Sequence, residues 1–398
     1  MTSGSSLRGR QTHRADTESG SAHGSVPDQE PAPAAVVALR PDPVAVEPVR
    51  ARTARLDQVD IARGLAVIGV VLNHAVDGLI GASLVLPTSA LAHFNDALYV
   101  FRMPTLALLL GLFIPLSVRR RGLGPYLRQR VVLFGYLYVV WFFLQSAVEA
   151  LTSGLRNSRS HPLSLLTIWN PPAHLWFIPF LVIASVVVGC LAPWRRGFVG
   201  WLGVLALGAA SVLTWGWNPS FIGLRGLSLL FFVALGATIQ VKGLNRAFRM
   251  PVLVWLVVGP LAVVAFYGLW RTGLAPATQE AQLSVPVVLR SVVAACVGIV
   301  IVLGLAVLLA SWGPARRALS AVGRRTLPIY LAHVMVVAGG RIVLDKVLHV
   351  EHVWVYPTVL VPAGVVVPLL LSLYARRLHL AWLFQLPQRL AARTGGTP

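Results

Sequence analysis

Long runs of apolar residues recur between about residue 61 and residue 375, and they limit the fold more than any other feature of the chain. A helix needs roughly 20 mostly apolar residues to cross the hydrocarbon core of a bilayer. Ten stretches meet this requirement: 61–80, 97–117, 131–151, 174–192, 198–215, 221–241, 251–270, 284–311, 327–344 and 354–375. The sequence therefore predicts an all-α, polytopic membrane protein with about ten transmembrane helices.

Composition agrees with this prediction. Hydrophobic residues make up 56% of the chain and charged residues 12%, whereas a typical soluble domain has about 25% charged residues. These values exclude an ordinary soluble enzyme, a disordered chain and a disulfide scaffold. Cys190 and Cys296 both lie in apolar runs, so we interpret them as small buried hydrophobes, without the spacing of a metal or redox site.

Basic residues alternate from one loop to the next. The loops after even-numbered helices hold 14 Lys and Arg residues, against 5 in the loops after odd-numbered helices. Cytoplasmic loops carry such an excess, so we expect both termini in the cytosol of a multi-pass cell-membrane protein. The net charge of +20 is thus explained by topology. No groove-reading motif accompanies it, and no nucleic-acid partner is expected.

Three regions follow from this pattern. Residues 1–55 are rich in Pro, Ala, Ser and Gly, with 7 basic and 6 acidic residues, and they are predicted to form a disordered cytosolic tail. Residues 56–380 form the predicted membrane domain, and residues 381–398 a cytosolic C-terminal tail. The first apolar run lies far behind the N-terminus, so we expect it to be a retained anchor and not a signal peptide.

Ionisable residues in the first predicted helix mark the best candidate site. Arg63 and His74 are eleven residues apart, which places them on one helix face, roughly 16 Å apart along the axis. Asp60 is spaced to pair with Arg63, and Asp77 follows His74 by three residues. A histidine exchanges protons near neutral pH, and an aspartate can orient it. Charged groups inside a membrane are costly and usually functional.

Two plainer interpretations stay open for this helix. Arg63 can be an anchor whose side chain extends to the membrane surface, and His74 can simply hydrogen-bond to a neighbouring helix. The second is weakened by the depth of His74 in the predicted crossing and by the carboxylate nearby.

This first helix resembles that of the membrane-bound acyltransferase 3 family, which has an Asp-x-x-Arg-Gly start and a His eleven residues after the Arg. The chain has Asp60, Arg63, Gly64 and His74 in those places. Further segments resemble the family's motifs in the same order: Phe101–Pro104, His174–Phe177, Phe231–Gly236 and Leu327–His333. The chain departs from the family pattern at Arg102, where the family has His. It also lacks the Ser of the family's Ser-Gly, which here is Leu110-Gly111, and the Ser that opens the last motif.

The resemblance implies transfer of an acyl group, with acetyl expected, from a cytosolic coenzyme A thioester to a hydroxyl, usually of a carbohydrate or glycoconjugate. Acyl-CoA would then be a co-substrate, and no bound cofactor or metal is expected. His74 would act as general base with Asp77 orienting it. A covalent acyl-histidine intermediate is the competing version. Arg102 is the candidate donor to an oxyanion.

The predicted topology sorts the candidates into two groups. On the cytosolic side we expect an acyl-donor site, where arginines suit phosphate groups: Asp60, Arg63, Arg128, Arg130, Tyr330 and His333. In the outer half we expect the catalytic His74 and Asp77 and an acceptor site: Arg102, His174, Trp176 and Arg225. Plainer roles stay open here too. Arg128 and Arg130 can be topological charges, His333 a structural hydrogen-bonding group, Trp176 an interfacial anchor, and Arg225 an ion-pair partner.

Two other functions remain as alternatives to an enzyme. A transporter or flippase of a sugar-containing or lipid-linked substrate would line its path with Arg and His, although the two halves of the chain show no convincing repeat of the kind common in transporters. A sensor or scaffold would bind a partner through the N-terminal tail. The stripe of ionisable residues on the first helix favours the enzyme.

Overall fold

The computed structural model describes residues 47–151, 167–172, 174–195, 197–388 and 390, and side chains from residue 57 onward. Helices and short turns make up this part of the chain, and it contains no strand. The main helices are α1 (Glu47–Gly81), α2 (Ala90–Gly111), α3 (Ile114–Arg121), α4 (Leu123–Leu151), α5 (Phe177–Leu191), α6 (Phe198–Leu213), α7 (Leu230–Phe248), α8 (Val252–Trp270), α9 (Val285–Ser311), α10 (Gly313–Arg324), α11 (Thr326–Ile342) and α12 (Val355–Tyr374).

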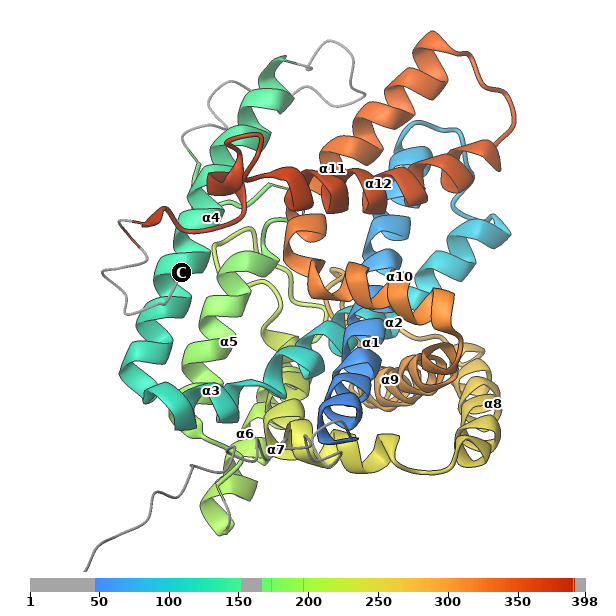
Figure 1. Cartoon of the computed structure of the whole chain (residues 1–398). Coiled ribbons are helices and arrows are strands. Elements are labelled where there is room, and N and C mark those ends of the chain that lie inside the picture. Colours follow the sequence, from blue (N-terminus) through green and yellow to red (C-terminus); the bar gives the residue numbers. More distant parts are fainter. Residues whose placement is uncertain (1–46, 152–166, 173, 196, 389, 391–398) are drawn as a thin grey trace, which may run out of the picture. The chain divides into compact units, whose positions relative to one another are not determined.

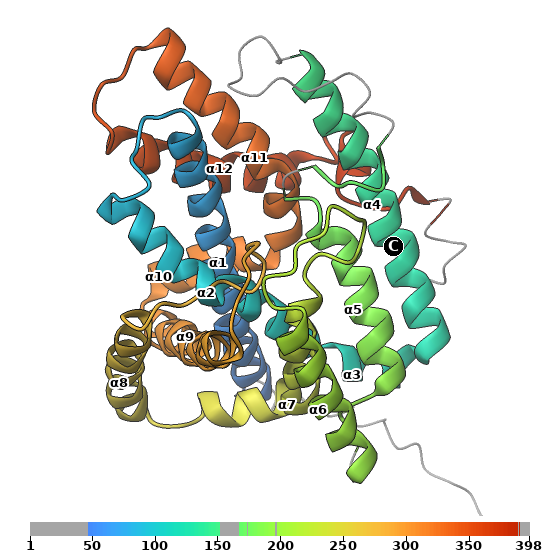
Figure 2. The same ribbon diagram turned by 180° about the vertical axis from the view of Figure 1, so that it is seen from behind.

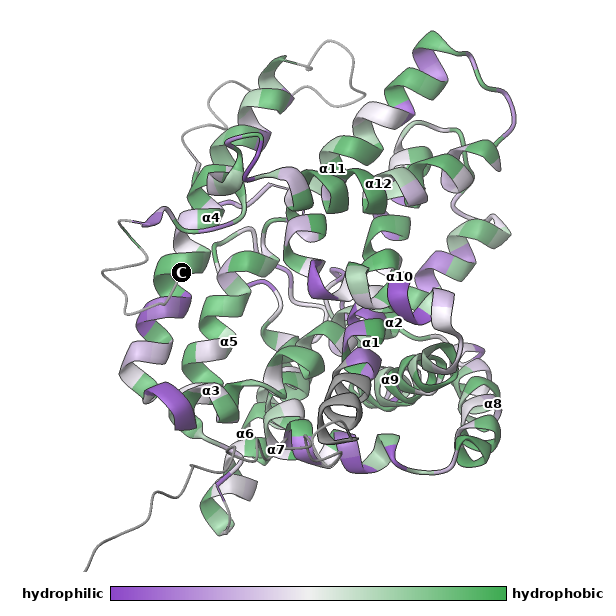
Figure 3. Cartoon of the chain, viewed as in Figure 1, coloured by the Kyte–Doolittle hydropathy of each residue, from purple (hydrophilic) through white to green (hydrophobic). Residues whose placement is uncertain are grey.

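Among the described residues, eight helices are long and apolar enough to cross a membrane. They confirm an all-helical membrane protein, and Figure 3 shows apolar residues along most of the length of the helices. The ten predicted crossings correspond to these eight plus α5 and α6. Those two helices have 15 and 16 residues, fewer than the roughly 20 that a perpendicular crossing needs. The count of ten and the side of each terminus therefore stay predictions.

Several predicted bounds differ from those observed. The span predicted at 221–241 begins too early, because α7 starts at Leu230 after turns and a short 3₁₀ segment. The span predicted at 97–117 is interrupted after Gly111, and α3 then starts with Pro115 in its first turn. The predicted tail 1–55 lies outside the described residues up to residue 46, and α1 begins at Glu47. The amphipathic α10 was not predicted at all.

Helix α1 is at the centre of the described bundle, with α2, α9, α10, α11 and α12 packed around it (Figure 1). The same neighbours surround it from behind (Figure 2). Its buried face includes Ala62, Ala66, Val67, Val70 and Val71. Residues of α1 therefore face partners on nearly every side, which explains how one helix can hold several functional side chains in place.

Glycines allow α1 and α10 to cross at very short range. A Cβ atom at Gly64 would lie 2.7 Å from the carbonyl oxygen of Leu319, and one at Gly323 would overlap the carbonyl oxygen of Asp60. Helix α2 and α7 meet in the same way at Gly111 and Gly236. Small residues let membrane helices approach closely where packing, not water exclusion, drives their association. The first crossing places Arg324 next to Asp60.

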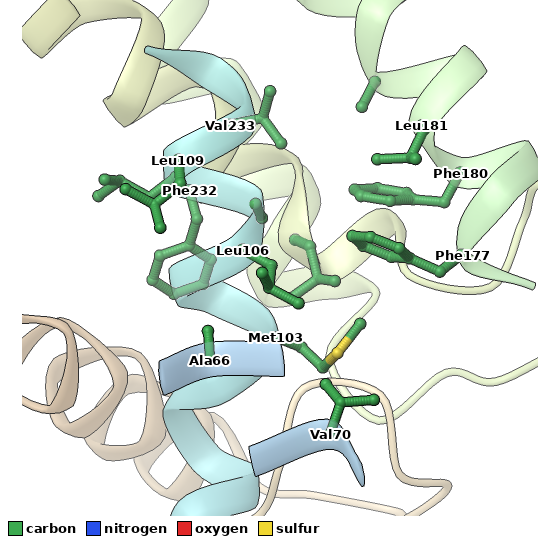
Figure 4. Close-up of a cluster of buried hydrophobic side chains, with 14 of the residues drawn as sticks. Ala66, Val70, Met103, Leu106, Leu109, Phe177, Phe180, Leu181, Phe232 and Val233 are labelled. Atoms are coloured by element: carbon green, nitrogen blue, oxygen red, sulfur yellow. The ribbon is translucent and has the colours of Figure 1, made fainter. Parts of the chain in front are cut away.

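One apolar cluster joins α1 and α2 to α5 and α7. Figure 4 shows Phe177, Phe180 and Leu181 of α5 pointing toward Met103 and Leu106 of α2. All five side chains are buried. Aromatic pairs add to this packing, since the Phe177 and Phe180 rings stack at 5.5 Å. The cluster fixes the start of α5, which directly follows His174 and Trp176.

The segment after α12 packs against α4. The Trp141 indole donates a hydrogen bond to the carbonyl oxygen of Leu383 at 2.7 Å, and the Tyr136 hydroxyl donates to that of Trp382 at 3.0 Å. Leu383 and Phe384 are buried. The predicted C-terminal tail, residues 381–398, thus starts with residues that are packed against the helices; most of its remainder lies outside the described residues.

Candidate active site

Three histidines from distant parts of the chain meet beside α1. His74 comes from α1, His174 from the turn before α5, and His333 from α11. Their ring centroids are 5.6 Å (His74–His174), 5.1 Å (His74–His333) and 4.9 Å (His174–His333) apart. His174 and His333 are buried, whereas His74 is half-buried. We call these three residues the histidine cluster.

The hydrogen bonds around His333 fix its protonated nitrogen. Its Nδ1 lies 2.7 Å from the carbonyl oxygen of Tyr330 and 3.1 Å from that of Ile329. A carbonyl oxygen only accepts, so Nδ1 carries the hydrogen and Nε2 carries a lone pair. That Nε2 is buried and has no hydrogen-bond partner among the described residues. A buried acceptor without a partner requires an explanation.

His174 is held by α4 and α11. Gln145 Nε2 lies 3.3 Å from His174 Nε2 and donates to the carbonyl oxygen of Leu331. The hydroxyl of Tyr330 donates to the backbone carbonyl oxygen of His174. The Nδ1 atom of His174 is also buried without a partner in the described part of the chain. Two of the three histidines thus each have one ring nitrogen free for another group.

A cavity of about 330 Å³ opens on one side of the histidine cluster. His74, Asp77, Gln145 and Arg341 contribute to its lining; we call it the histidine-side cavity. Asp77 accepts a hydrogen bond from Asn73 at 2.7 Å. The structure contains no hydrogen bond between Asp77 and His74 among its described contacts. The expected His–Asp pair is therefore wrong as a direct contact, and His74 has histidine neighbours in its place.

Asp77 is instead linked to Arg102 through two amides. Asn73 Oδ1 accepts from Asn95 Nδ2 at 3.0 Å, and Asn95 Oδ1 accepts from Arg102 Nη1 at 3.1 Å. Arg102 is buried, and its Cζ lies 3.9 Å from the centroid of the Tyr99 ring, a cation–π arrangement. Its Nη2 has no partner among the described residues. Arg102 therefore stabilises the α1–α2 pair.

A second cavity, of about 260 Å³, is lined by several of the residues that the sequence analysis assigned to a cytosolic acyl-donor site. Arg63, Arg130, Arg324 and Tyr330 line it together with apolar residues of α2 and α5; we call it the arginine-side cavity. Arg63 and Arg324 lie 3.6 Å and 3.8 Å from the carboxylate of Asp60. Among the described residues, Asp60 thus pairs with two of the three guanidinium groups at this cavity, and Arg130 forms no ion pair.

The other arginines predicted as site residues differ in whether they line a cavity. Arg130 lies near the Tyr126 and Phe134 rings and lines the arginine-side cavity, but Arg128 is exposed and lines none of the described cavities. Arg225 lies outside a helix, with its Cζ 5.2 Å from the centroid of the buried Trp176 ring. Burial lowers the pKa of Arg225. Trp176 faces the protein interior and not the lipid.

Tyr330 and His333 belong to different parts of the site. Both were predicted on the cytosolic side, with His74 and His174 in the outer half. Tyr330 does line the arginine-side cavity, but His333, one helical turn further along α11, lies against His74 and His174. The prediction that placed these histidines at different depths is wrong. Both cavities adjoin the histidine cluster: His74 lines the histidine-side cavity, and Tyr330, which lines the arginine-side cavity, has its ring 5.2 Å from that of His174.

Sequence reasoning missed four residues of this site: Asn73, Asn95, Gln145 and Arg324. The first three are uncharged amides, and a search for ionisable groups passes over them. Asn73 and Gln145 lie inside predicted spans, and Asn95 lies just before one. Arg324 was counted only as a topological charge, because α10 was not predicted. Among the described residues, no group of three His, Cys, Asp or Glu side chains could hold a metal ion.

The helices define a multi-pass membrane protein, and this buried polar centre is its candidate active site. A family model described as an acyltransferase domain, that of the acyltransferase 3 family, matches residues 56–376, so the chain belongs to this family of acyltransferases. Comparisons with curated proteins and with solved structures gave no significant match. The match covers every residue of the histidine cluster and of both cavities.

Proposed function

We propose that this acyltransferase moves an acyl group, typically acetyl, from cytosolic acyl-CoA to a hydroxyl of a carbohydrate or glycoconjugate. The observation that carries the proposal is the order of groups beside α1: an arginine-lined cavity, a buried histidine cluster, and a second cavity with His74 in its wall. This order suits a donor and an acceptor that approach one reactive centre from different directions.

The arginine-side cavity suits the donor. Guanidinium groups bind phosphates in bidentate fashion, and two of the three arginines, Arg63 and Arg324, share the single carboxylate of Asp60. Phe177, Leu181 and Leu106 give the same cavity apolar walls, which suit a pantetheine arm and an acyl chain. Acyl-CoA is a co-substrate in this proposal, and no resident cofactor is needed.

The reaction follows from the histidine cluster. His74 takes the proton of the acceptor hydroxyl while the oxygen attacks the thioester carbonyl carbon. The carbon–sulfur bond then breaks, and the coenzyme A thiolate receives the proton from the His74 imidazolium. An ester and free coenzyme A are the products. The lone pair on His333 Nε2 supports the second N–H of the imidazolium while it exists.

The other residues of the two cavities are assigned to the donor or to the acceptor in the same way. Asp60, Arg63, Arg130, Arg324 and Tyr330 belong to the donor side, and Asp77 with Arg341 to the acceptor side, where Asp77 can bind a sugar hydroxyl. The basic loops favour cytosolic termini and a cell-membrane location. Residues 1–46 have no assigned role in the chemistry.

The test uses the purified full-length protein with radiolabelled acetyl-CoA and a panel of carbohydrate acceptors, and it measures coenzyme A release and acceptor labelling. Wild type and His352→Ala, which changes an exposed loop histidine, are expected to turn over. His74→Ala should fold but transfer no acyl group, and Arg63→Gln should raise the KM for acetyl-CoA. Turnover by His74→Ala at the wild-type rate would contradict the proposal. Substrate flux across vesicles without any acyl donor would point to a transporter.

A further inference from the structure

A separate group of cavities lies away from the histidine cluster, where α3 meets α7. One cavity of about 400 Å³ and one of about 690 Å³ share Arg119, Gln240 and Lys242 in their linings. Together we call them the basic groove. None of the residues named for the donor or acceptor sites lines it.

The charge of the basic groove is entirely positive. Its lining includes five cations, Arg119, Arg195, Lys242, Arg246 and Arg249, and no Asp or Glu. In the described part of the chain, none of the five forms an ion pair. All five side chains are exposed and like charges repel, so an anion bound nearby would stabilise this arrangement.

The groove also has apolar walls, and these extend to α6. Leu112, Leu116 and Trp194 line it beside the cations. A third cavity, which shares Trp194 and Arg195 with it, continues to Trp201 and Val204 of α6. On α6, Phe198 is 80% exposed and Trp201 66% exposed. Both ribbon views show α6 beside α7 (Figures 1 and 2).

An anion with apolar chains matches this combination. Basic pockets between membrane helices bind anionic lipid head groups, and a 16-residue helix is short for a bilayer, so that lipid packs against it under hydrophobic mismatch. We propose that the basic groove binds the head group of an anionic phospholipid, whose acyl chains lie along the exposed face of α6. This inference does not depend on the proposed O-acyl transfer.

The experiment measures binding of short-chain phosphatidylglycerol to the delipidated full-length protein in neutral detergent, with phosphatidylcholine of equal chain length as the zwitterionic probe. The groove variant is Lys242→Gln/Arg246→Gln/Arg249→Gln. A matched control, Arg317→Gln/Arg376→Gln/Arg377→Gln, removes the same charge from exposed positions outside the groove. Thermal midpoints verify that both variants fold, and the single variant Arg119→Gln provides an independent test of the same groove.

We expect phosphatidylglycerol to bind in a salt-dependent way and phosphatidylcholine to bind weakly. The groove variant should lose on the order of 100-fold in affinity for phosphatidylglycerol, and the control variant less than about threefold. Equal losses in both variants would overturn the proposal in favour of diffuse surface charge. Competition by inorganic phosphate or by coenzyme A as strong as that by the lipid would overturn it in favour of a soluble phosphate ligand.

Discussion

The ring of His333 lies 5.1 Å from that of His74, and its Nδ1–H is held by the carbonyl oxygens of Tyr330 and Ile329. Rings at this separation can bring two nitrogens within hydrogen-bonding distance when they turn toward each other. Because His333 is buried and lines neither of the two cavities, we infer that it acts through His74 as a positioning residue.

Replacing His333 by Gln should distinguish a role of His333 in positioning His74 from a purely structural role. Gln has a similar volume and an amide that hydrogen-bonds, but it cannot take up a proton. We expect kcat to fall about 100-fold, with an altered pH profile of kcat and an unchanged KM for acyl-CoA. Steady-state kinetics with a thermal melt of the same sample measure this. A purely structural role would appear instead as a lower melting midpoint with an unchanged pH profile.

Two neighbouring arginines at the start of α4 provide a matched pair for donor binding. Arg130 lines the arginine-side cavity, whereas Arg128 is exposed and does not. Arg130→Gln should raise the KM for acetyl-CoA about tenfold through the loss of a phosphate contact, and Arg128→Gln should leave it nearly unchanged. Titration of acetyl-CoA at fixed acceptor distinguishes the two. Equal effects would mean that long-range charge and not the cavity attracts the donor.

The glycine crossing of α1 and α10 should tolerate no side chain. In Gly323→Ala the new Cβ would overlap the Asp60 carbonyl oxygen, so the helices must separate. We expect a loss of about 1–3 kcal/mol and weaker donor binding as Arg324 moves from Asp60. The control Gly339→Ala adds a methyl group where nothing lies within 4 Å. Unfolding midpoints in a denaturing detergent compare them, and similar midpoints would refute the close-packing argument.

Asn95 connects Asn73 to Arg102. The stability of a variant at this position should therefore depend on whether the new side chain is apolar or negatively charged. Asn95→Leu removes both hydrogen bonds and leaves the buried guanidinium without its amide partner, at a cost of about 1–3 kcal/mol. Asn95→Asp supplies a carboxylate to Arg102 and should be markedly more stable than Asn95→Leu. The same detergent unfolding assay ranks the two. If Asn95→Leu proved the more stable, the amide chain would not be what stabilises Arg102.

The sequence supplied the class of fold and the key residues of α1, and the structure supplied their partners. Apolar length predicts helices such as α9 and α12 almost to the residue, because insertion in a bilayer depends on local composition. It fails at α10, whose charged face follows a different pattern. The pairing of His74 with His333 depends on how α1 packs against α11, and no local spacing encodes that contact. The spacing of His74 and Asp77 indicated a pair, but Asn73 competes for the carboxylate.

Arg102 also bears on how the protein is made. A central arginine costs a nascent membrane helix about 2.5–3.5 kcal/mol on insertion scales, and α2 carries one at its middle. The groups that hold it, Asn95 and the carbonyl oxygen of Gly69, belong to α2 itself and to α1, which the ribosome has already synthesised. Helices α1 and α2 can therefore leave the translocon together as a hairpin, with both of these hydrogen bonds of Arg102 Nη1 formed before any later helix is made.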